Sequence, residues 1–287
     1  MNFLHAIWEF FISIVFSNGA YQILMLWVFF ALYAVGNLPR SIRTQSLWGR
    51  LLLNIGSKAM MLPFFVLLGL GVEVGVAVEL VMCASAMLAI AFSLHVGNYS
   101  RFFARTDLTQ SVSLVIFLAH RDSAFAANYP HMTRFLLVFF VPYAASNAIL
   151  IAAEFFMEKK CGKGTIHLED FHNLWVGEKI VAVSLLAAMM FLIGIPPLTG
   201  FAWRAAIVKS LIVEHRGLTI GLILCFISLG YTYFKWILAI FKTVPAQASQ
   251  PRARLPLSTE LSAKLLMAGC TAAIVYCCYI CTLKHFA

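Results

Sequence analysis

One lysine lies deep inside an apolar stretch of the sequence. Lys58 is part of the stretch 51–71, about 10 Å of helix rise from the nearest polar flank. A cation inside a membrane costs about 2.5–3.5 kcal/mol on insertion scales and is therefore a functional candidate. Burial favours the neutral amine, whereas a nearby carboxylate favours the charged form. We interpret Lys58 as a residue that holds or releases a proton when its partner moves. The alternatives are snorkelling and a structural ion pair.

A second basic candidate is Arg204, which lies four residues after Gly200 and seven after Pro197. Arginine stays charged at any relevant pH. Its expected role is therefore electrostatic, either to maintain a local electric field or to orient water. The alternative is that the segment 202–215 emerges from the membrane, so that Arg204 and its polar neighbours are simply solvated.

Two further ionisable residues are candidates for the same proton chemistry. Glu79 is separated from Lys58 by one helical hairpin and is the expected partner of that lysine. Lys235 lies in the aromatic stretch 231–236, where anchoring at the membrane interface and pairing with a buried partner remain open.

The sequence contains no phosphate loop, dinucleotide fingerprint, nucleophile elbow or metal motif. Six of the seven cysteines fall in apolar stretches and are expected to be small buried hydrophobes. Cys277, Cys278 and Cys281 do not have metal-ligand spacing, because only His285 follows them beyond the end of their stretch. We therefore expect no metal site, no cofactor bound by this chain and no self-contained active site.

The elements that position these residues follow from composition. The chain is 62% hydrophobic and 11% charged, whereas soluble domains have about 45–50% and about 25%. The apolar runs lack the alternation of membrane strands, so an all-α integral membrane protein is predicted, with about nine to ten transmembrane helices in one membrane domain, 1–287. The predicted apolar stretches are 2–18, 21–38, 51–71, 75–97, 107–120, 132–157, 176–213, 217–242 and 261–283.

The net charge of +9 is concentrated in the connecting segments, where it can contact phospholipid headgroups. Nucleic-acid binding is not expected, because these clusters lack the context of a nucleic-acid module. The polar segment 158–174 is predicted to be a surface loop. Glu178 and Lys179 open the seventh apolar stretch and are interpreted as an interfacial pair.

Two of the apolar stretches have prolines beside their candidate cations: Pro63 lies in 51–71, and Pro196 and Pro197 lie in 176–213. Proline removes a backbone N–H and clashes with the preceding turn, so both helices are predicted to be kinked or broken there. Broken helices in paired positions are typical of ion-conducting and transport sites.

These motifs resemble those of a known family. Gly194-Ile-Pro-Pro-Leu-Thr-Gly200-Phe201, followed by Arg204, resembles the Gly-Leu-Pro-Pro-Leu-[Ser/Thr]-Gly-Phe-x-x-Lys signature of subunit 2 of mitochondrial NADH:ubiquinone oxidoreductase, respiratory complex I. Lys58, followed by Pro63-Phe64, is similar to the Lys-x4-Pro-Phe of that family, whose lysine handles protons. The resemblance covers an antiporter-like core, 51–287, and leaves the N-terminal helices of 1–50 unaligned.

The resemblance implies a membrane-arm subunit of complex I, a multi-pass protein of the mitochondrial inner membrane. Its partners would be other membrane-arm subunits and phospholipid. It would contribute to proton translocation coupled to quinone reduction elsewhere in the complex, with Lys58, Glu79, Arg204 and Lys235 as proton-translocation residues.

Two alternatives remain. Arg204 replaces the family's lysine, and 74–97 contains no Lys or Arg, which favours a structural subunit that does not pump. A stand-alone cation/proton antiporter is the third reading, although its chain would normally be longer.

Overall fold

The computed structural model describes residues 46–51, 97–119, 132–196, 198–212, 215–244 and 256–286. Apart from one isolated bridge between Asn98 and His167, these ranges contain no β-structure. Besides a short helical turn at 47–51, the elements are α6 (Tyr99–Ala119), α8 (Met132–Cys161), the 3-10 helix η2 (Leu168–Phe171), α9 (Leu174–Gly177), α10 (Lys179–Ile193), α11 (Thr199–Leu211), α12 (Arg216–Phe241) and α13 (Leu257–Phe286). The all-α class is confirmed for this part of the chain. The total of nine to ten helices stays a prediction.

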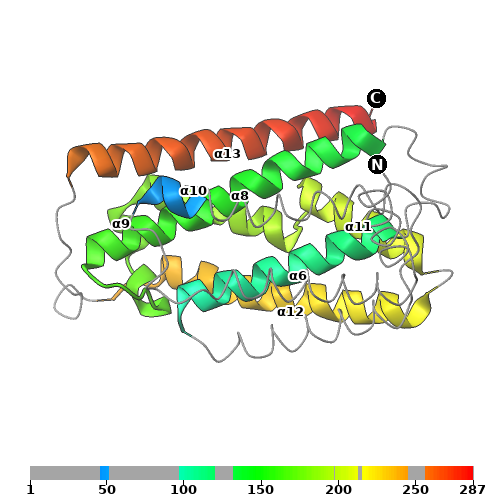
Figure 1. Cartoon of the computed structure of the whole chain (residues 1–287), viewed down its shortest axis with the longest axis horizontal. Coiled ribbons are helices and arrows are strands. Elements are labelled where there is room, and N and C mark those ends of the chain that lie inside the picture. The colour runs from blue at the N-terminus through cyan, green and yellow to red at the C-terminus, as the bar shows by residue number, and fades with distance from the viewer. Residues whose placement is uncertain are drawn as a thin grey trace, which may run out of the picture.

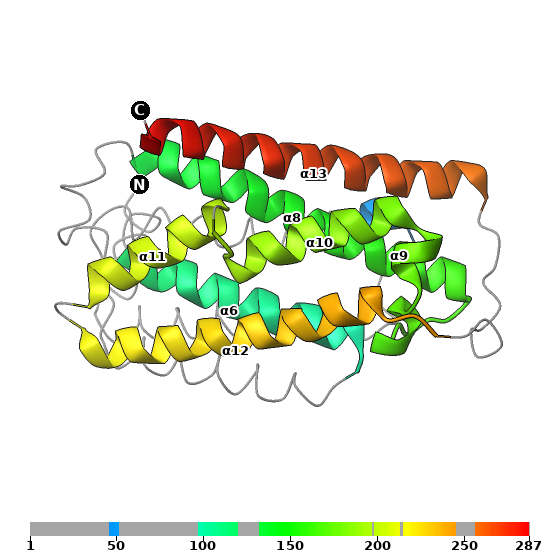
Figure 2. The ribbon, with the colours of Figure 1, turned by 180° about the vertical axis from the view of Figure 1, so that it is seen from behind.

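The long helices lie side by side along one axis of the molecule (Figures 1 and 2). α13 runs along α8 on one side of the bundle, α6 and α12 lie on the other, and α10 and α11 lie between them. α8 packs against both α13 and α10, while α12 contacts α10, α11 and α6. The pair α10–α11 therefore lies between α8 and α13 on one side and α12 on the other.

By length and hydropathy, two of the described helices can cross a bilayer: α12, and α13 over Leu257–Tyr279. They coincide with the predicted stretches 217–242 and 261–283. A third crossing is available only if the segments Leu168–Gly177 and Lys179–Ile193, which are bent by 120°, are taken as one.

The boundaries of α6 and α8 differ from those predicted. α6 begins at Tyr99 and α8 ends at Cys161, whereas the apolar stretches were 107–120 and 132–157. The additional turns of α6, 99–106, mix aromatic with polar residues, and Ser100 there donates to Glu154 of α8, so an apolar-run criterion does not detect them. The additional turn of α8 carries Lys159 and Lys160, and cations are favourable at a helix C-terminus.

Five buried aromatic rings join three elements at one end of the bundle. Tyr99 and Phe102 of α6, Phe171 of η2, and Tyr233 and Trp236 of α12 are each at most 2% exposed. Their ring centroids lie 4.8–5.8 Å apart in the contacting pairs. The segment 158–174 is therefore not simply a surface loop as predicted, because Phe171 inserts into this aromatic cluster.

Asn173 connects the same segment to the end of α12. Its side-chain Nδ2 donates to the carbonyl of Val244 at 2.9 Å, and its Oδ1 accepts from the Val244 N–H at 2.9 Å. The backbone of Asn173 is left-handed, with φ 62°, a conformation that asparagine tolerates better than most residues. These two hydrogen bonds hold the end of α12 beside the start of α9.

Candidate functional site

The central feature of the site is the interruption between α10 and α11. α10 ends at Ile193, Gly194 adopts a left-handed conformation with φ 75°, and α11 begins at Thr199. The Gly194 N–H donates to the carbonyls of Met190 and Phe191 where the helix ends. Pro196, two residues later, has no N–H with which to continue the helix. Pro196 lies exposed in this break, whereas Pro197 lies outside the described residues.

Gly200 allows the two half-helices to meet at backbone distance. A Cβ atom at this position would lie 2.1 Å from the carbonyl oxygen of Phe191. Any larger residue would therefore push the start of α11 away from the end of α10. The glycine is required by this close approach rather than by its φ angle.

Arg204 caps the end of α10 from the first turns of α11. Its guanidinium donates to the carbonyls of Leu192 and Ile193 and lies 4.6 Å from the centroid of the Phe226 ring. Gln110 Nε2 also donates to the Leu192 carbonyl, at 2.8 Å. The last carbonyls of a helix lack intrahelical partners and form the negative end of its dipole. Arg204 is 8% exposed, so the alternative of a solvated arginine is wrong.

A row of buried polar side chains leads along the contact between α6 and α8. Ser100 Oγ donates to the carboxylate of Glu154, which is 4% exposed. Two turns further along α6, Asp107 Oδ1 accepts a 2.8 Å hydrogen bond from the hydroxyl of Tyr143. A buried carboxylate is costly unless it is hydrogen-bonded. These two acids are thus held by hydroxyl groups of the neighbouring helix.

The row, comprising Ser100, Glu154, Asp107 and Tyr143, has an ion pair near one end and a buried tyrosine near the other. At one end Arg50 Nη2 binds Glu158 at 2.6 Å, one turn beyond Glu154 on α8. At the other, Tyr233 lies within electrostatic range of both Asp107 and Arg204 and hydrogen-bonds Thr106. Carboxylates and hydroxyls can each bind and release protons, and acid chains inside membranes are typical of proton relays. The row therefore has the composition of a proton path.

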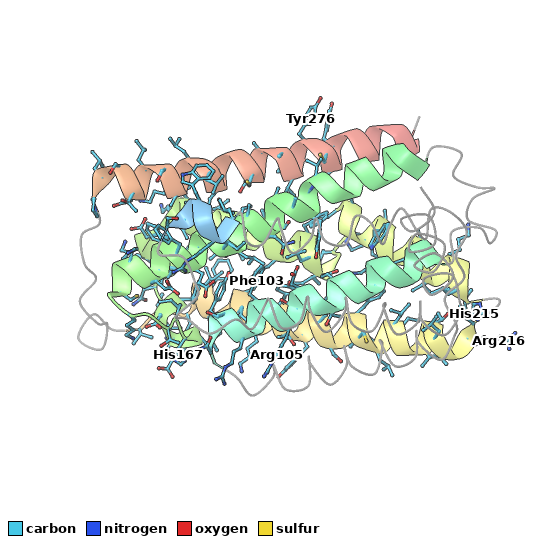
Figure 3. The ribbon with its side chains drawn as sticks, viewed as in Figure 1. Phe103, Arg105, His167, His215, Arg216 and Tyr276 are labelled. Carbon is cyan, nitrogen blue, oxygen red and sulfur yellow. The ribbon has the colours of Figure 1, made fainter. Side chains whose placement is uncertain are left out.

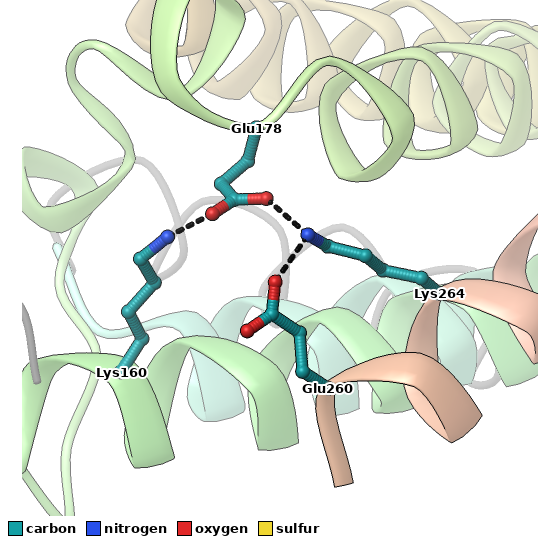
Figure 4. A network of polar contacts seen from close by, with 4 residues as sticks. All are labelled: Lys160, Glu178, Glu260 and Lys264. Atoms are coloured by element: carbon teal, nitrogen blue, oxygen red, sulfur yellow. Dashed lines mark hydrogen bonds and ion pairs between the residues drawn. The ribbon is translucent and has the colours of Figure 1, made fainter. Parts of the chain in front are cut away.

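A second charged cluster, the ion network, lies where α8, α10 and α13 meet (Figure 4). Glu178 binds Lys160 of α8 on one oxygen and Lys264 of α13 on the other, the latter at 2.8 Å. Lys264 also binds Glu260. The interpretation of Glu178 and Lys179 as an interfacial pair is wrong, because Glu178 is 9% exposed and binds lysines from two other helices.

Comparison with known proteins connects this geometry to a membrane enzyme complex. No family model matches the chain. Over 139 residues it is 26% identical to NADH-ubiquinone oxidoreductase chain 2 of Dictyostelium discoideum, an alignment that covers 48% of this chain and 27% of the relative. The chain resembles subunit 2 of respiratory complex I. This confirms the resemblance drawn from the motifs.

The fold of a complex I chain is similar as well. A chain of respiratory complex I from Thermus thermophilus, solved with bound aureothin, matches with a TM-score of 0.55 and 17% identity, over 72% of this chain and 44% of that one. The protein thus spans less than half the length of each of these two complex I chains.

The proton-translocation residues implied by the resemblance to complex I are only partly described. Arg204 lies at the break, and Lys235 is half-buried on α12 beside the buried Trp236. Lys58, Glu79 and the predicted break at Pro63 lie outside the described residues. Their roles stay predictions.

Two acids of this row, the buried Glu154 and the partly buried Asp107, were not among the candidates predicted from the sequence. Glu154 lies within the predicted stretch 132–157, and Asp107 opens the stretch 107–120. Each carried the same signal as Lys58, an ionisable residue at or inside an apolar stretch. No metal site compensates for their charge within the described ranges, where no group of three or more His, Cys, Asp or Glu could hold an ion.

Proposed function

We propose that this chain is a membrane-arm subunit of the proton-translocating NADH:ubiquinone oxidoreductase of the mitochondrial inner membrane. It contributes to proton translocation, while partner subunits oxidise NADH and reduce quinone. The similarity to chain 2 of that enzyme supports the assignment to the complex. The observation that carries a proton-handling role is the row of hydrogen-bonded acids between α6 and α8, in which Ser100 donates to Glu154 and Tyr143 donates to Asp107.

In this proposal the acids and the arginine have different tasks. Glu154 and Asp107 bind and release protons in turn, with Ser100 and Tyr143 as hydroxyl partners. Arg204 does not release a proton; it supplies a fixed positive charge that favours ionised carboxylates and orients water. Lys58, its expected partner Glu79 and Lys235 are proposed as further members of the same path.

A structural role without pumping is the second candidate, and one observation favours it. The guanidinium of Arg204 donates to the carbonyls of Leu192 and Ile193 and stacks on Phe226. These contacts join α10 to α11 whether or not a proton passes. A stand-alone cation/proton antiporter would instead be active without the other subunits.

The decisive experiment uses Glu154→Gln in the assembled complex, reconstituted in closed vesicles. Glutamine still accepts the Ser100 hydrogen bond but cannot ionise. We expect the number of protons moved per NADH oxidised to fall, while NADH oxidation with an uncoupler persists. Glu169→Gln, at an exposed position of η2, is the matched control and leaves the ratio unchanged. An unchanged ratio in Glu154→Gln would instead support the structural role.

A further inference from the structure

An apolar groove of about 740 Å³ runs along the outer face of the bundle between α10 and α13. Ala268 and Ala272 line it on α13 and contribute only methyl groups, which leaves room between the two helices. Val183 of α10 faces the same space. The groove ends near Tyr279, and the neighbouring Tyr276 projects outward from α13 (Figure 3).

The length of the groove matches one leaflet of a bilayer. From Ala268 to Tyr279 the axis of α13 rises by about 16 Å, and half of a hydrocarbon core is about 15 Å thick. These residues lie in the part of α13 that can cross a membrane. A transmembrane helix of a partner would need contact over the full core, whereas a single acyl chain fills one leaflet.

The polar end of the groove carries an exposed lysine. Lys179 lines the groove at the start of α10, and within the described part of the chain it forms no ion pair. The neighbouring ion network is internally balanced, because Lys160 and Lys264 bind Glu178 and Glu260. Lys179 is therefore the cation beside this groove whose charge remains to be compensated.

We propose that this groove is a binding site for an anionic phospholipid of the surrounding bilayer. The lipid phosphate binds the Lys179 ammonium, and one acyl chain lies along Val183 and Ala272 towards Tyr279. Juxtamembrane lysines attract anionic headgroups, and the uncharged groove accepts the chain. The site is independent of proton translocation and requires only that α13 lies in the membrane.

The test measures lipid binding to the full chain purified within its complex. Native mass spectrometry compares phosphatidylglycerol with phosphatidylcholine at equal concentration. Lys179→Gln is expected to weaken phosphatidylglycerol binding about fivefold and to weaken phosphatidylcholine binding less, because the choline group offsets the phosphate charge. Lys159→Gln, an exposed cation on α8 that does not line the groove, is the matched control.

A second variant tests the acyl-chain position. Ala272 is exposed, so Ala272→Leu fills the groove without entering the core, and it is expected to weaken the binding of both lipids. The proposal is overturned if Lys179→Gln and Lys159→Gln have equal effects, or if Ala272→Leu changes nothing. It is also overturned if Ala272→Cys can be cross-linked to a partner subunit in the complex, because a protein helix would then occupy the groove.

Discussion

The guanidinium of Arg204 donates to the main-chain carbonyl of Leu192, across the break between α11 and α10. A buried cation is usually held by a carboxylate, but here the end of a helix provides the acceptors. The position of this charge therefore depends on the geometry of the backbone. The break and the arginine form one unit, and changing either should disturb the other.

Replacing Arg204 tests that unit. Arg204→Met leaves the carbonyls of Leu192 and Ile193 without its two donors, so we expect a loss of about 2–3 kcal/mol of stability. Arg204→Lys keeps the charge but cannot reproduce the planar fork, and should lose about half as much. Thermal unfolding of the purified complex in detergent measures both. Equal stability of Arg204→Met and the wild type would contradict the capping role.

Gly200 should not tolerate a methyl group. In Gly200→Ala the new Cβ would meet the Phe191 carbonyl oxygen at 2.1 Å, so the half-helices must separate, at an expected cost of about 1–3 kcal/mol. Gly269→Ala is the matched control, because no atom lies within 4 Å of its Cβ position. It should be neutral or slightly stabilising. The melting temperatures of Gly200→Ala and Gly269→Ala, each compared with the wild type, test this prediction.

The ion network predicts different effects for its two acids. Glu178→Gln leaves Lys160 and Lys264 without their shared carboxylate, and we expect a loss of about 2–4 kcal/mol, since one partner of a largely buried pair is removed. Glu260 is 31% exposed and binds Lys264 within one helix, so Glu260→Gln should cost about 0.5 kcal/mol or less. Chemical denaturation of both variants would show whether this ranking holds.

His172 predicts a dependence of stability on pH. Burial lowers the pKa of His172 below its ordinary value, and the charge of Lys242 lowers it further. The unfolded chain then binds more protons than the folded chain, so stability falls as the pH decreases through about 6.5. His172→Asn should flatten that part of the stability profile. An identical profile in the variant would show that other groups cause the dependence.

Local sequence patterns predicted the elements whose cause is local. α12 and α13 follow from continuous apolar runs, and the end of α10 coincides with a glycine and two prolines that oppose helix continuation. The start of α6 was not predictable in this way, because its buried Tyr99 and Phe102 are interspersed with polar residues. The position of Glu154 within an apolar stretch is explained by a distant residue, Ser100, which donates to it.

Contacts between residues far apart in the sequence could not be predicted either, because local patterns do not indicate them. Lys264 reaches Glu178 from 86 positions further along the chain, and nothing near Glu178 indicates this. The adjacent Lys179 was the obvious partner, but neighbouring residues on a helix do not face each other. Phe171 likewise lies in a polar stretch of the sequence, and only the fold places it against the rings of Tyr99 and Trp236.

The ion network also has a consequence for biogenesis. Lys160 and Glu178 leave the ribosome well before Lys264, so α8 and α10 must wait for the C-terminal helix to supply the second cation. Until α13 inserts, one oxygen of the Glu178 carboxylate lacks its lysine and the side of α8 that α13 covers stays open. A nascent chain that ends before Lys264 would therefore expose both the carboxylate oxygen and this face of α8, whereas the finished chain covers them.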